Sequence, residues 1–404
     1  MNREQFAAYA DVVVRVGANV QPGQTLTVHS PVEAVELARA VMEAGWRAGA
    51  GNVEVLYVDD FDRYLLAKHA PDELLDRSSV VQRASAEAAL EQRGASVTIF
   101  GDVTPDYFRE VDEARLARTR PREVRELINR VLNEQLEAWT VIGFPQRSWA
   151  ERMFGAPDVE RLWHEIEKTC RLDRPDPVAA WEEHLDRLAE RTQLLDERRF
   201  DRLRFRGPGT DLELGLLERS RWIGGRTETA WGQSFCANLP TEEVYTTPDR
   251  TRAEGTLRAT RPVSYAEGIL VEGVELRFQG GRIVEARASS GEEFLHNHLR
   301  TDEGSDRLGE VALVADSPIA ASGLLWYHTL FDENATSHVA YGSAYTEPVE
   351  GVEGLDEAAQ EALGINQSHV HVDFAVGGPE VEVEGIDGCG ESVPILAGDD
   401  WLLA

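Results

Sequence analysis

The feature that most constrains the fold is an alternation of helical and extended patterns through the first half of the chain. Apolar residues recur at helical spacing over residues 4–17 and 32–46, and runs rich in β-branched residues lie at 25–30 and 52–58. The same theme returns later, with extended runs at 96–101 and 140–145 and a helical run at 122–139. Strands that alternate with helices favour a mainly parallel sheet covered by helices. We therefore expect an N-terminal α/β domain.

A glycine pair in this half could suggest a nucleotide-binding or oxidoreductase module. Gly49 and Gly51 follow a predicted helix and precede a predicted strand. A dinucleotide-binding motif needs the reverse order, with the glycines between a strand and the helix whose N-terminus holds the phosphates. The pair instead predicts a turn that ends a helix.

The pattern changes near Arg199. Residues 159–199 are helical and heavily charged, and short alternating runs with turn residues between them follow at 211–216, 273–278, 281–288 and 381–385. A length of 404 residues also favours two domains over one. We expect an α/β domain with a helical connector over 1–198 and a β-rich, α+β domain over 199–404.

Charge narrows the range of partners. The formal net charge is −31, with 72 acidic and 41 basic residues. Nucleic acid and anionic membranes are excluded as partners because binding phosphates needs a basic surface. Only Lys68 and Lys168 are lysines, and so acidic a surface suits a salt-rich cytoplasm where counterions screen repulsion.

The compartment is expected to be the cytoplasm. No stretch of eighteen apolar residues occurs, and residues 1–20 lack the order of a signal peptide. The three cysteines, Cys170, Cys236 and Cys389, are far apart and odd in number, which fits a reducing environment. Cys389 lies in a glycine-rich stretch, where a turn residue is a simpler interpretation than a nucleophile.

Candidate ligands for a metal gather in the second half. Six of the ten histidines fall between His296 and His371. In an extended strand His369, His371 and Asp373 would share one face, so an imidazole and a carboxylate could meet one ion. The alternative is a strand with a polar, solvent-facing side.

A second group of polar residues lies at 331–338. Glu333 and His338 are five apart, so a bend must bring them together if they act jointly. Burying this mixture of acids, amide and imidazole is costly without a compensating ion. The alternative is that Asp332 or Asn334 simply caps a helix.

Three further acids complete the candidates. Glu242 and Glu243 lie between Pro240 and Pro248, which stiffen the backbone, although a polar loop explains them equally well. Glu310 enters a strongly apolar run, where an inward carboxylate needs a cation.

These segments together resemble the aminopeptidase T and aminopeptidase S family of dimetal metallo-aminopeptidases. The resemblance spans the chain and is carried by Asn238-Leu-Pro-Thr-Glu-Glu-Val-Tyr-Thr, Arg307-Leu-Gly-Glu-Val-Ala-Leu-Val, Thr329-Leu-Phe-Asp-Glu-Asn-Ala with His338, and His369-Val-His-Val-Asp-Phe. It implies six metal ligands, which are Glu243, Glu310, Glu333, His338, His371 and Asp373. Glu310 would be shared by both ions, and Glu242 is the fallback for Glu243. His369 is not a ligand in that family.

The resemblance also implies the chemistry. Two divalent ions, zinc, cobalt or manganese, would activate a shared water that attacks the N-terminal peptide bond of peptides with a free amine. Tyr345 would polarise the substrate carbonyl or stabilise the tetrahedral intermediate. Glu310 or another acid would be the general base, and Glu242 is one candidate partner for the substrate amine. A homodimer is implied as well. A metal-dependent dipeptidase or another small-amide hydrolase on the same ligands is the main alternative.

Overall fold

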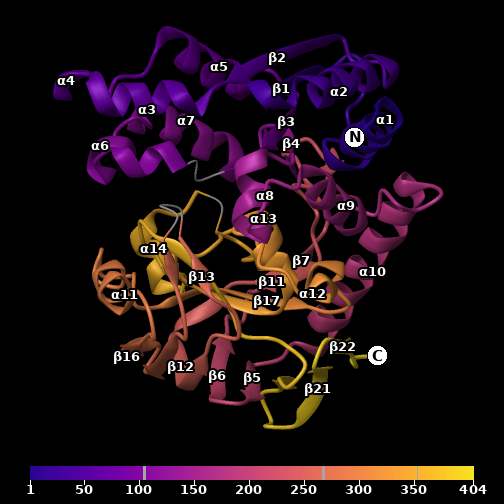
Figure 1. The fold of residues 1–404 in the computed structure, drawn as a ribbon. Coiled ribbons are helices and arrows are strands. Elements are labelled where there is room, and N and C mark those ends of the chain that lie inside the picture. The colour runs from indigo at the N-terminus through magenta and orange to yellow at the C-terminus, as the bar shows by residue number, and fades with distance from the viewer. Residues whose placement is uncertain (103–105, 266–268, 353) are drawn as a thin grey trace. The chain divides into compact units, whose positions relative to one another are not determined.

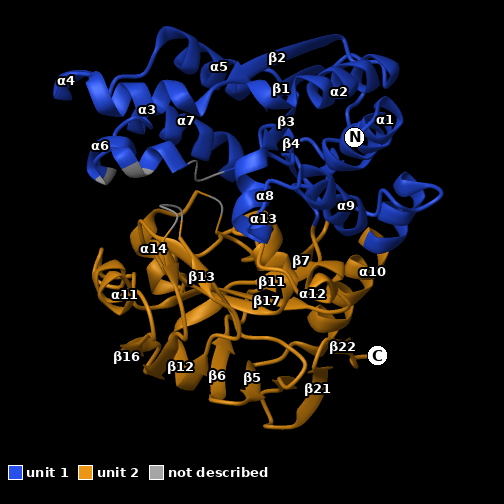
Figure 2. Cartoon of the chain, in the orientation of Figure 1, with its two compact units in different colours: residues 1–184, 226–240 blue, residues 185–225, 241–404 orange. Residues whose placement is uncertain are grey.

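The chain divides into two compact units in a computed structural model that describes residues 1–102, 106–265, 269–352 and 354–404 (Figure 1). The first unit comprises residues 1–184 and 226–240, and the second comprises 185–225 and 241–404 (Figure 2). The segment 226–240 therefore belongs with the N-terminal unit although it lies beyond Arg199. A division of the sequence between residues 198 and 199 stays a prediction.

The first unit is built on a parallel sheet, as the alternating pattern predicted. Its strands follow the order β10-β4-β3-β1-β2 and are all parallel. They are β1 (Thr25–Pro31), β2 (Asn52–Val58), β3 (Ala95–Phe100), β4 (Ala138–Gly143) and β10 (Asn238–Leu239). In β1 every second residue is buried, and Leu26 and Val28 are fully buried. A short hairpin of β8 (Thr227–Glu228) and β9 (Ser234–Phe235) completes the strands of this unit.

Helices join these strands. They are α1 (Arg3–Val12), α2 (Val35–Arg47), α3 (Asp60–His69), α4 (Asp72–Leu75), α5 (Val80–Glu91), α6 (Glu113–Ala117), α7 (Arg122–Asn133), α8 (Arg147–Phe154) and α9 (Val159–Thr169). A π-helical turn, Val13–Gly17, extends α1, and 3-10 turns occupy Val32–Ala34 and Asp106–Glu110. The long helix α10 (Pro177–Arg198) runs from the first unit into the second.

Two local predictions can be compared with these elements. Gly49 adopts a φ of +91° directly after α2, which confirms the turn expected there. The helix expected over 122–139 is too long, because α7 ends at Asn133 and residues 138–139 already belong to β4. Trp139 follows a helical apolar spacing in the sequence, but pairing of β4 with β3 decides its conformation.

The second unit contains two antiparallel sheets. The smaller has the order β19-β18-β17-β11-β7, with β7 (Ile223–Gly224), β11 (Glu243–Thr246), β17 (Leu308–Val314), β18 (His338–Gly342) and β19 (His371–Ala375). The larger has the order β16-β15-β12-β6-β5-β20-β21-β22, with β5 (Arg202–Gly207), β6 (Thr210–Leu216), β12 (Pro248–Arg258), β15 (Glu275–Gln279), β16 (Arg282–Arg287), β20 (Glu382–Ile386), β21 (Ser392–Ala397) and β22 (Asp400–Trp401). The β-rich character expected for this part of the chain is confirmed.

The described part of the second unit also contains a short hairpin and four helices. A hairpin consists of β13 (Val263–Ser264) and β14 (Leu270–Val271), and the helices are α11 (Glu292–His298), α12 (Pro318–Ser322), α13 (Thr329–Asp332) and α14 (Glu357–Ala362). The 3-10 turn η4 (Glu333–Ala335) continues α13 and contacts β19. The middle strand β17 is buried along its whole length, so the smaller sheet forms the core of this unit.

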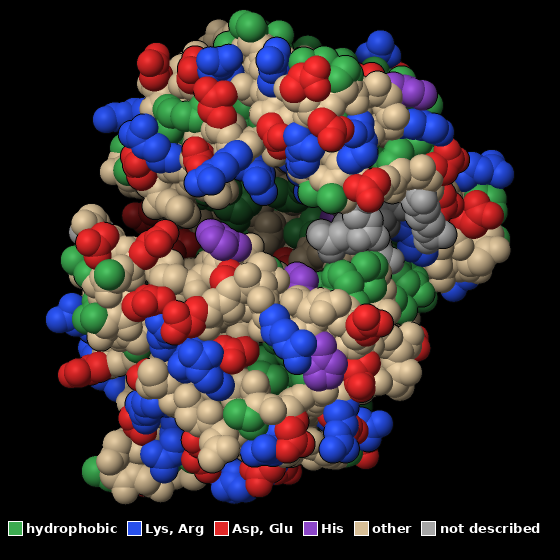
Figure 3. Space-filling model, turned by 90° about the vertical axis from the view of Figure 1, so that its left-hand side faces the viewer, with side chains coloured by type: hydrophobic (Ala, Val, Ile, Leu, Met, Phe, Trp, Pro, Cys, Tyr) green, Lys and Arg blue, Asp and Glu red, His purple; other side chains and the backbone are tan. Residues whose placement is uncertain are grey.

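The surface shown in Figure 3 carries acidic side chains interspersed with basic ones. Among the described residues, no helix has both the length and the apolar character needed to cross a membrane.

Candidate metal centre

Five of the six expected ligands lie on the smaller sheet of the second unit. Strand pairing sets Ala312 opposite His338, Glu310 opposite Ala340, and Ala340 opposite Asp373. Directly opposed residues share a face of a sheet, and so do residues two apart in one strand. Glu310, His338 and Asp373 therefore point to the same side.

The remaining two strand residues follow the same rule. Gly342 lies opposite His371, and Val314 lies opposite Glu243. The five side chains thus come from four neighbouring strands, β11, β17, β18 and β19, and meet on one face. Segments separated by more than a hundred positions are joined in this way by antiparallel pairing.

Distances confirm that the side chains converge. Among the described residues, Glu243, Glu310 and His338 form one group whose potential ligand atoms lie within 4.8 Å of one another, and Glu310, His371 and Asp373 form a second. Nε2 of His338 lies 3.4 Å from Oε2 of Glu243, and Nε2 of His371 lies 3.1 Å from Oε2 of Glu310. Glu310 belongs to both groups, as expected of a carboxylate between two ions.

Glu333 approaches the same region from η4. It lies outside the two groups, but its charge interacts with those of Glu243, Asp373 and Glu310. Burial and these carboxylates raise the pKa of Glu333 well above its ordinary value. The bend expected between Glu333 and His338 is present, since η4 ends at Ala335 and β18 begins at His338.

The histidine rings are oriented by the backbone. Nδ1 of His371 lies 2.8 Å from the carbonyl oxygen of Ser343, and Nδ1 of His338 lies 3.3 Å from that of Thr336. A carbonyl oxygen only accepts hydrogen bonds, so each Nδ1 donates and each Nε2 faces the carboxylates. Metal-binding histidines are commonly held in this way.

Burial and the closeness of several carboxylates shift the pKa values of the candidate ligands. Burial, with added repulsion from Glu310 and Asp373, raises the pKa of Glu243 to about 7 although His338 opposes the shift. Burial lowers the pKa of His371, but Asp373 and Glu310 outweigh it and the net pKa is well above 6.5. Burial raises the pKa of Asp373, and His371 outweighs it, so the net pKa is lowered.

The donor set fits divalent cations. Oε2 of Glu243 is buried and accepts no hydrogen bond from the described residues, and a buried carboxylate oxygen of this kind is costly unless a cation satisfies it. Carboxylates mixed with imidazoles suit zinc, cobalt or manganese, whereas no thiolate takes part.

The other expected residues are placed as follows. The ring of Tyr345 lies 5.0 Å from that of His371 and 5.7 Å from that of Tyr245. Desolvation of its hydroxyl and the charge of Glu310 raise the pKa of Tyr345 above 10, although 46% of the residue is exposed. Glu242 is buried and its backbone N–H donates to Oδ1 of Asn334 at 2.7 Å. His369 is exposed and precedes β19, so it does not extend the strand as its alternation with His371 had predicted.

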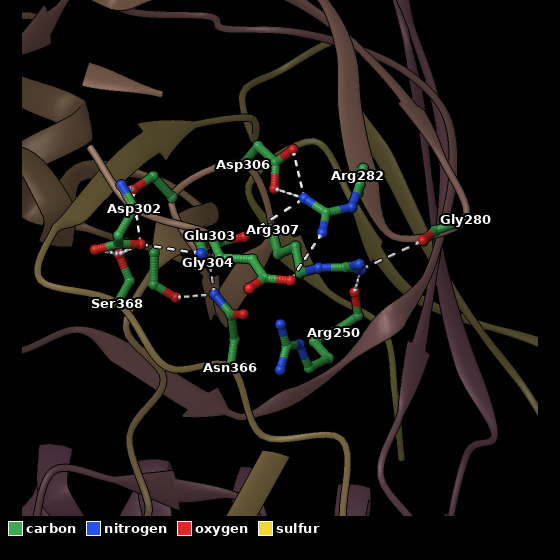
Figure 4. Close-up of polar contacts among 12 residues, drawn as sticks. Arg250, Gly280, Arg282, Asp302, Glu303, Gly304, Asp306, Arg307, Asn366 and Ser368 are labelled. Carbon is green, nitrogen blue, oxygen red and sulfur yellow. Dashed lines mark hydrogen bonds and ion pairs between the residues drawn. The ribbon is translucent and has the colours of Figure 1, made fainter. Parts of the chain in front are cut away.

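Asp302 supports the site, although no motif in the sequence indicates it. Asp302 accepts a hydrogen bond from the backbone N–H of His369 at 2.7 Å. It accepts another from Oγ of Ser368 at 2.9 Å (Figure 4). It also accepts from the N–H of Gly304 and Oγ of Ser305, both at 2.9 Å. Asp302 therefore ties its own loop to the segment that leads into His371. No spacing in the sequence connects residues 66 or 67 positions apart.

Known proteins match this chain along almost its whole length. A family model described as thermophilic metalloprotease (M29) matches residues 2–401. Aminopeptidase T of Thermus aquaticus is 40% identical over 407 residues, covering 99% of each chain, and aminopeptidase PepS of Streptococcus thermophilus is 38% identical over 418 residues, covering 99% of this chain and 98% of that one.

Solved structures agree as well. Wild-type AmpT from Thermus thermophilus superposes with a TM-score of 0.91 at 38% identity, covering 99% of both chains. A 2,5-dihydroxypyridine dioxygenase from Pseudomonas putida KT2440 shares the fold alone, with a TM-score of 0.56 at 13% identity over 100% of this chain and 99% of that one. The chain belongs to the M29 family of metalloproteases and is an aminopeptidase.

Proposed function

We propose that the chain holds two divalent metal ions and uses them to hydrolyse the first peptide bond of peptides with a free N-terminus. Glu243, Glu310 and His338 would hold one ion, and Glu310, His371 and Asp373 the other, with Glu333 as a further ligand. The observation that carries the proposal is the membership of Glu310 in both ligand groups. When bound, the ions would supply a water of lowered pKa and polarise the peptide carbonyl.

The residues of the chain have separate roles in this proposal. Glu310, or another acid beside it, would take a proton from the reacting water and pass it to the amine nitrogen that leaves as the C–N bond breaks. The hydroxyl of Tyr345, which stays protonated because its pKa is raised, donates a hydrogen bond to the carbonyl oxygen as charge develops there. The carbonyl oxygen of Ser343 keeps His371 in place by accepting from Nδ1 at 2.8 Å, which leaves Nε2 for the metal.

Further proposals accompany this mechanism. We place the enzyme in the cytoplasm as a homodimer, with zinc, cobalt or manganese as the native metal. Glu242, which is buried and directly precedes Glu243, stays a candidate partner for the substrate amine.

Metal analysis combined with substrate profiling tests the proposal. Dialysis against EDTA should abolish hydrolysis of leucine amides, and zinc, cobalt or manganese should restore it with two ions bound per chain. Peptides with an acetylated N-terminus should resist cleavage, and their hydrolysis would contradict exopeptidase specificity. A fully active protein with one ion per chain would contradict the two-metal mechanism.

A further inference from the structure

A cavity of about 330 Å³ opens beside the ligands in the second unit. Its lining includes Glu333, His338, His371 and Asp373, so it is the space in which a substrate would meet the metal centre. The segment 261–265, which contains β13, forms another part of the wall. Within the part of the chain that the structure describes, Arg261 is the one arginine or lysine in this lining.

The backbone fixes the position of Arg261 relative to the ligands. The N–H of Thr260 donates to the carbonyl oxygen of Ala375 at 2.8 Å, and Oγ1 of Thr260 donates to that of Gly377 at 2.7 Å. Ala375 lies two residues beyond Asp373 on the same face of β19, and two residues of a strand span about 7 Å. Arg261 therefore begins beside the end of β19 and lies in the wall of the cavity that His371 and Asp373 also line.

Among the described residues, the guanidinium of Arg261 makes one hydrogen bond and no ion pair. Nη1 donates to the carbonyl oxygen of Leu324 at 3.0 Å, and no carboxylate among the described residues lies within ion-pair distance of Arg261. A guanidinium offers five donors in a planar fork. The neighbouring carboxylate of Asp332 is already held by the N–H groups of Trp326 and His328, at 2.8 and 3.0 Å.

A partly buried, unpaired guanidinium favours an anionic ligand, and a carboxylate matches its fork in two parallel hydrogen bonds. The peptide offers such a group. An extended dipeptide spans at most about 7 Å and a tripeptide about 10 Å, so a short peptide with its amine at the ligands can extend into the cavity that Arg261 lines. Val263, Leu325 and Val372 supply apolar wall for the intervening side chains.

We propose that Arg261 binds the C-terminal carboxylate of a di- or tripeptide whose N-terminal residue lies at the metal ligands. The inference rests on the proposed function, since it takes the substrate amine to lie at the metal centre. It assigns Arg261 a part in substrate selection, by which the enzyme favours short peptides with a free C-terminus.

The test compares each peptide with its C-terminal amide on the metal-loaded enzyme. For the wild type we expect kcat/KM for Leu-Leu to exceed that for Leu-Leu amide by about 10- to 100-fold, chiefly through KM, because a hydrogen bond between charged groups is lost with the amide. Arg261→Gln should reduce this ratio to about 1, and Arg261→Lys should retain part of it. Arg277→Gln is the matched control, since Arg277 pairs with Glu285 on the larger sheet and should leave the ratio at the wild-type value.

The outcomes separate the inference from the proposed function. A wild-type ratio near 1, which needs no variant, would overturn the role of Arg261 while the hydrolysis of both substrates still supports an aminopeptidase. Failure to cleave either substrate with metal bound would instead contradict the proposed function. A preference for Glu-Leu amide over Leu-Leu amide that Arg261→Gln removes would show that Arg261 reads an acidic side chain, which also overturns the proposal. Bound metal and melting temperature are measured for each variant, so a ratio is compared only between folded, loaded proteins.

Discussion

Nδ1 of His371 lies 2.8 Å from the carbonyl oxygen of Ser343, the residue that follows the neighbouring strand β18. The contact directs Nε2 toward Glu310, 3.1 Å away. Ser343 is in turn held by its own N–H, which donates to the carbonyl oxygen of Val370 at 2.7 Å. The orientation of the ring therefore depends on the backbone hydrogen bond that joins the residues next to the two strands.

Removing the charge of Glu310 should disable both ligand groups. Glu310→Gln keeps the size of the side chain but takes away the carboxylate that the groups share. We expect kcat/KM to fall by at least about a thousandfold and the bound metal, measured by elemental analysis, to fall below two ions per chain. Glu285→Gln, which changes an exposed glutamate on the larger sheet, is the control. Wild-type metal content and activity in Glu310→Gln would refute its bridging position.

Stabilisation by metal should grow with pH. In the metal-free protein the pKa of Glu243 is raised to about 7, so its contribution to stability is present below its unfolded value near 4.5 and is lost as the pH rises through 7. The raised pKa values of His338 and His371 act in the same direction. Metal binds the deprotonated ligands, so it competes with protons at low pH.

The melting temperature of metal-loaded protein minus that of EDTA-treated protein measures this effect. We expect the difference to be larger at pH 8 than at pH 6. The pKa of Asp373 is lowered, so this carboxylate is already deprotonated over this pH range and does not contribute to the difference. An equal or smaller difference at pH 8 would show that these groups do not release protons to the metal.

Tyr345→Phe should slow the chemical step. The substitution removes a hydroxyl beside the ring of His371 and leaves the apolar contacts. Loss of one hydrogen-bond donor to a developing oxyanion typically costs about 100-fold or more in kcat, and KM should change little. Tyr245→Phe is the control, because the hydroxyl of Tyr245 donates to Glu347 at 3.1 Å. Equal losses in both variants would assign Tyr345 a packing role.

Asp302→Ala should loosen the approach to His371. It removes the acceptor of four hydrogen-bond donors (Figure 4), and we expect the free energy of unfolding to fall by about 3 kcal/mol. Metal affinity should fall by about 10- to 100-fold, as is typical when a supporting contact is lost. Asp306→Ala breaks an ion pair with Arg282 at the surface and should cost about 1 kcal/mol or less.

Acid titration tests whether the charge of Asp302 is what stabilises its loop. Burial raises the pKa of Asp302, but the N–H of His369 and the hydroxyls of Ser305 and Ser368 outweigh it, so the net pKa is lowered. Its contribution is present above the unfolded pKa near 3.8 and is lost as the pH falls through the folded value. The gap between the wild type and Asp302→Ala in denaturant titrations should therefore narrow toward pH 3. A constant gap would mean that the charge of Asp302 is not what stabilises the loop.

The sequence predicted the parallel sheet and the region of the metal centre because both depend on local patterns. Alternation along one strand is sufficient to set His371 and Asp373 on one face. The meeting of Glu243 with His338 depends on the register of strands β11, β17 and β18, and no local pattern encodes that register. The family resemblance, not the spacing, supplied it in advance. Arg261 gave no signal, because an arginine before a proline in a turn resembles many surface arginines until the cavity is seen.

Salt should stabilise the protein. The chain carries a net charge of −31, and although acidic and basic side chains are interspersed on the surface in Figure 3, the excess of 72 acidic over 41 basic residues leaves net repulsion. At 1 M salt the screening length falls to about 3 Å, so repulsion between neighbouring carboxylates is largely removed. We expect the melting temperature of the metal-loaded protein to rise steadily from low salt to molar KCl. Sucrose at matched osmolality serves as the control, because it strengthens burial without screening charge. No rise with KCl, or an equal rise with sucrose, would remove the link between the acidic surface and a salt-rich cytoplasm.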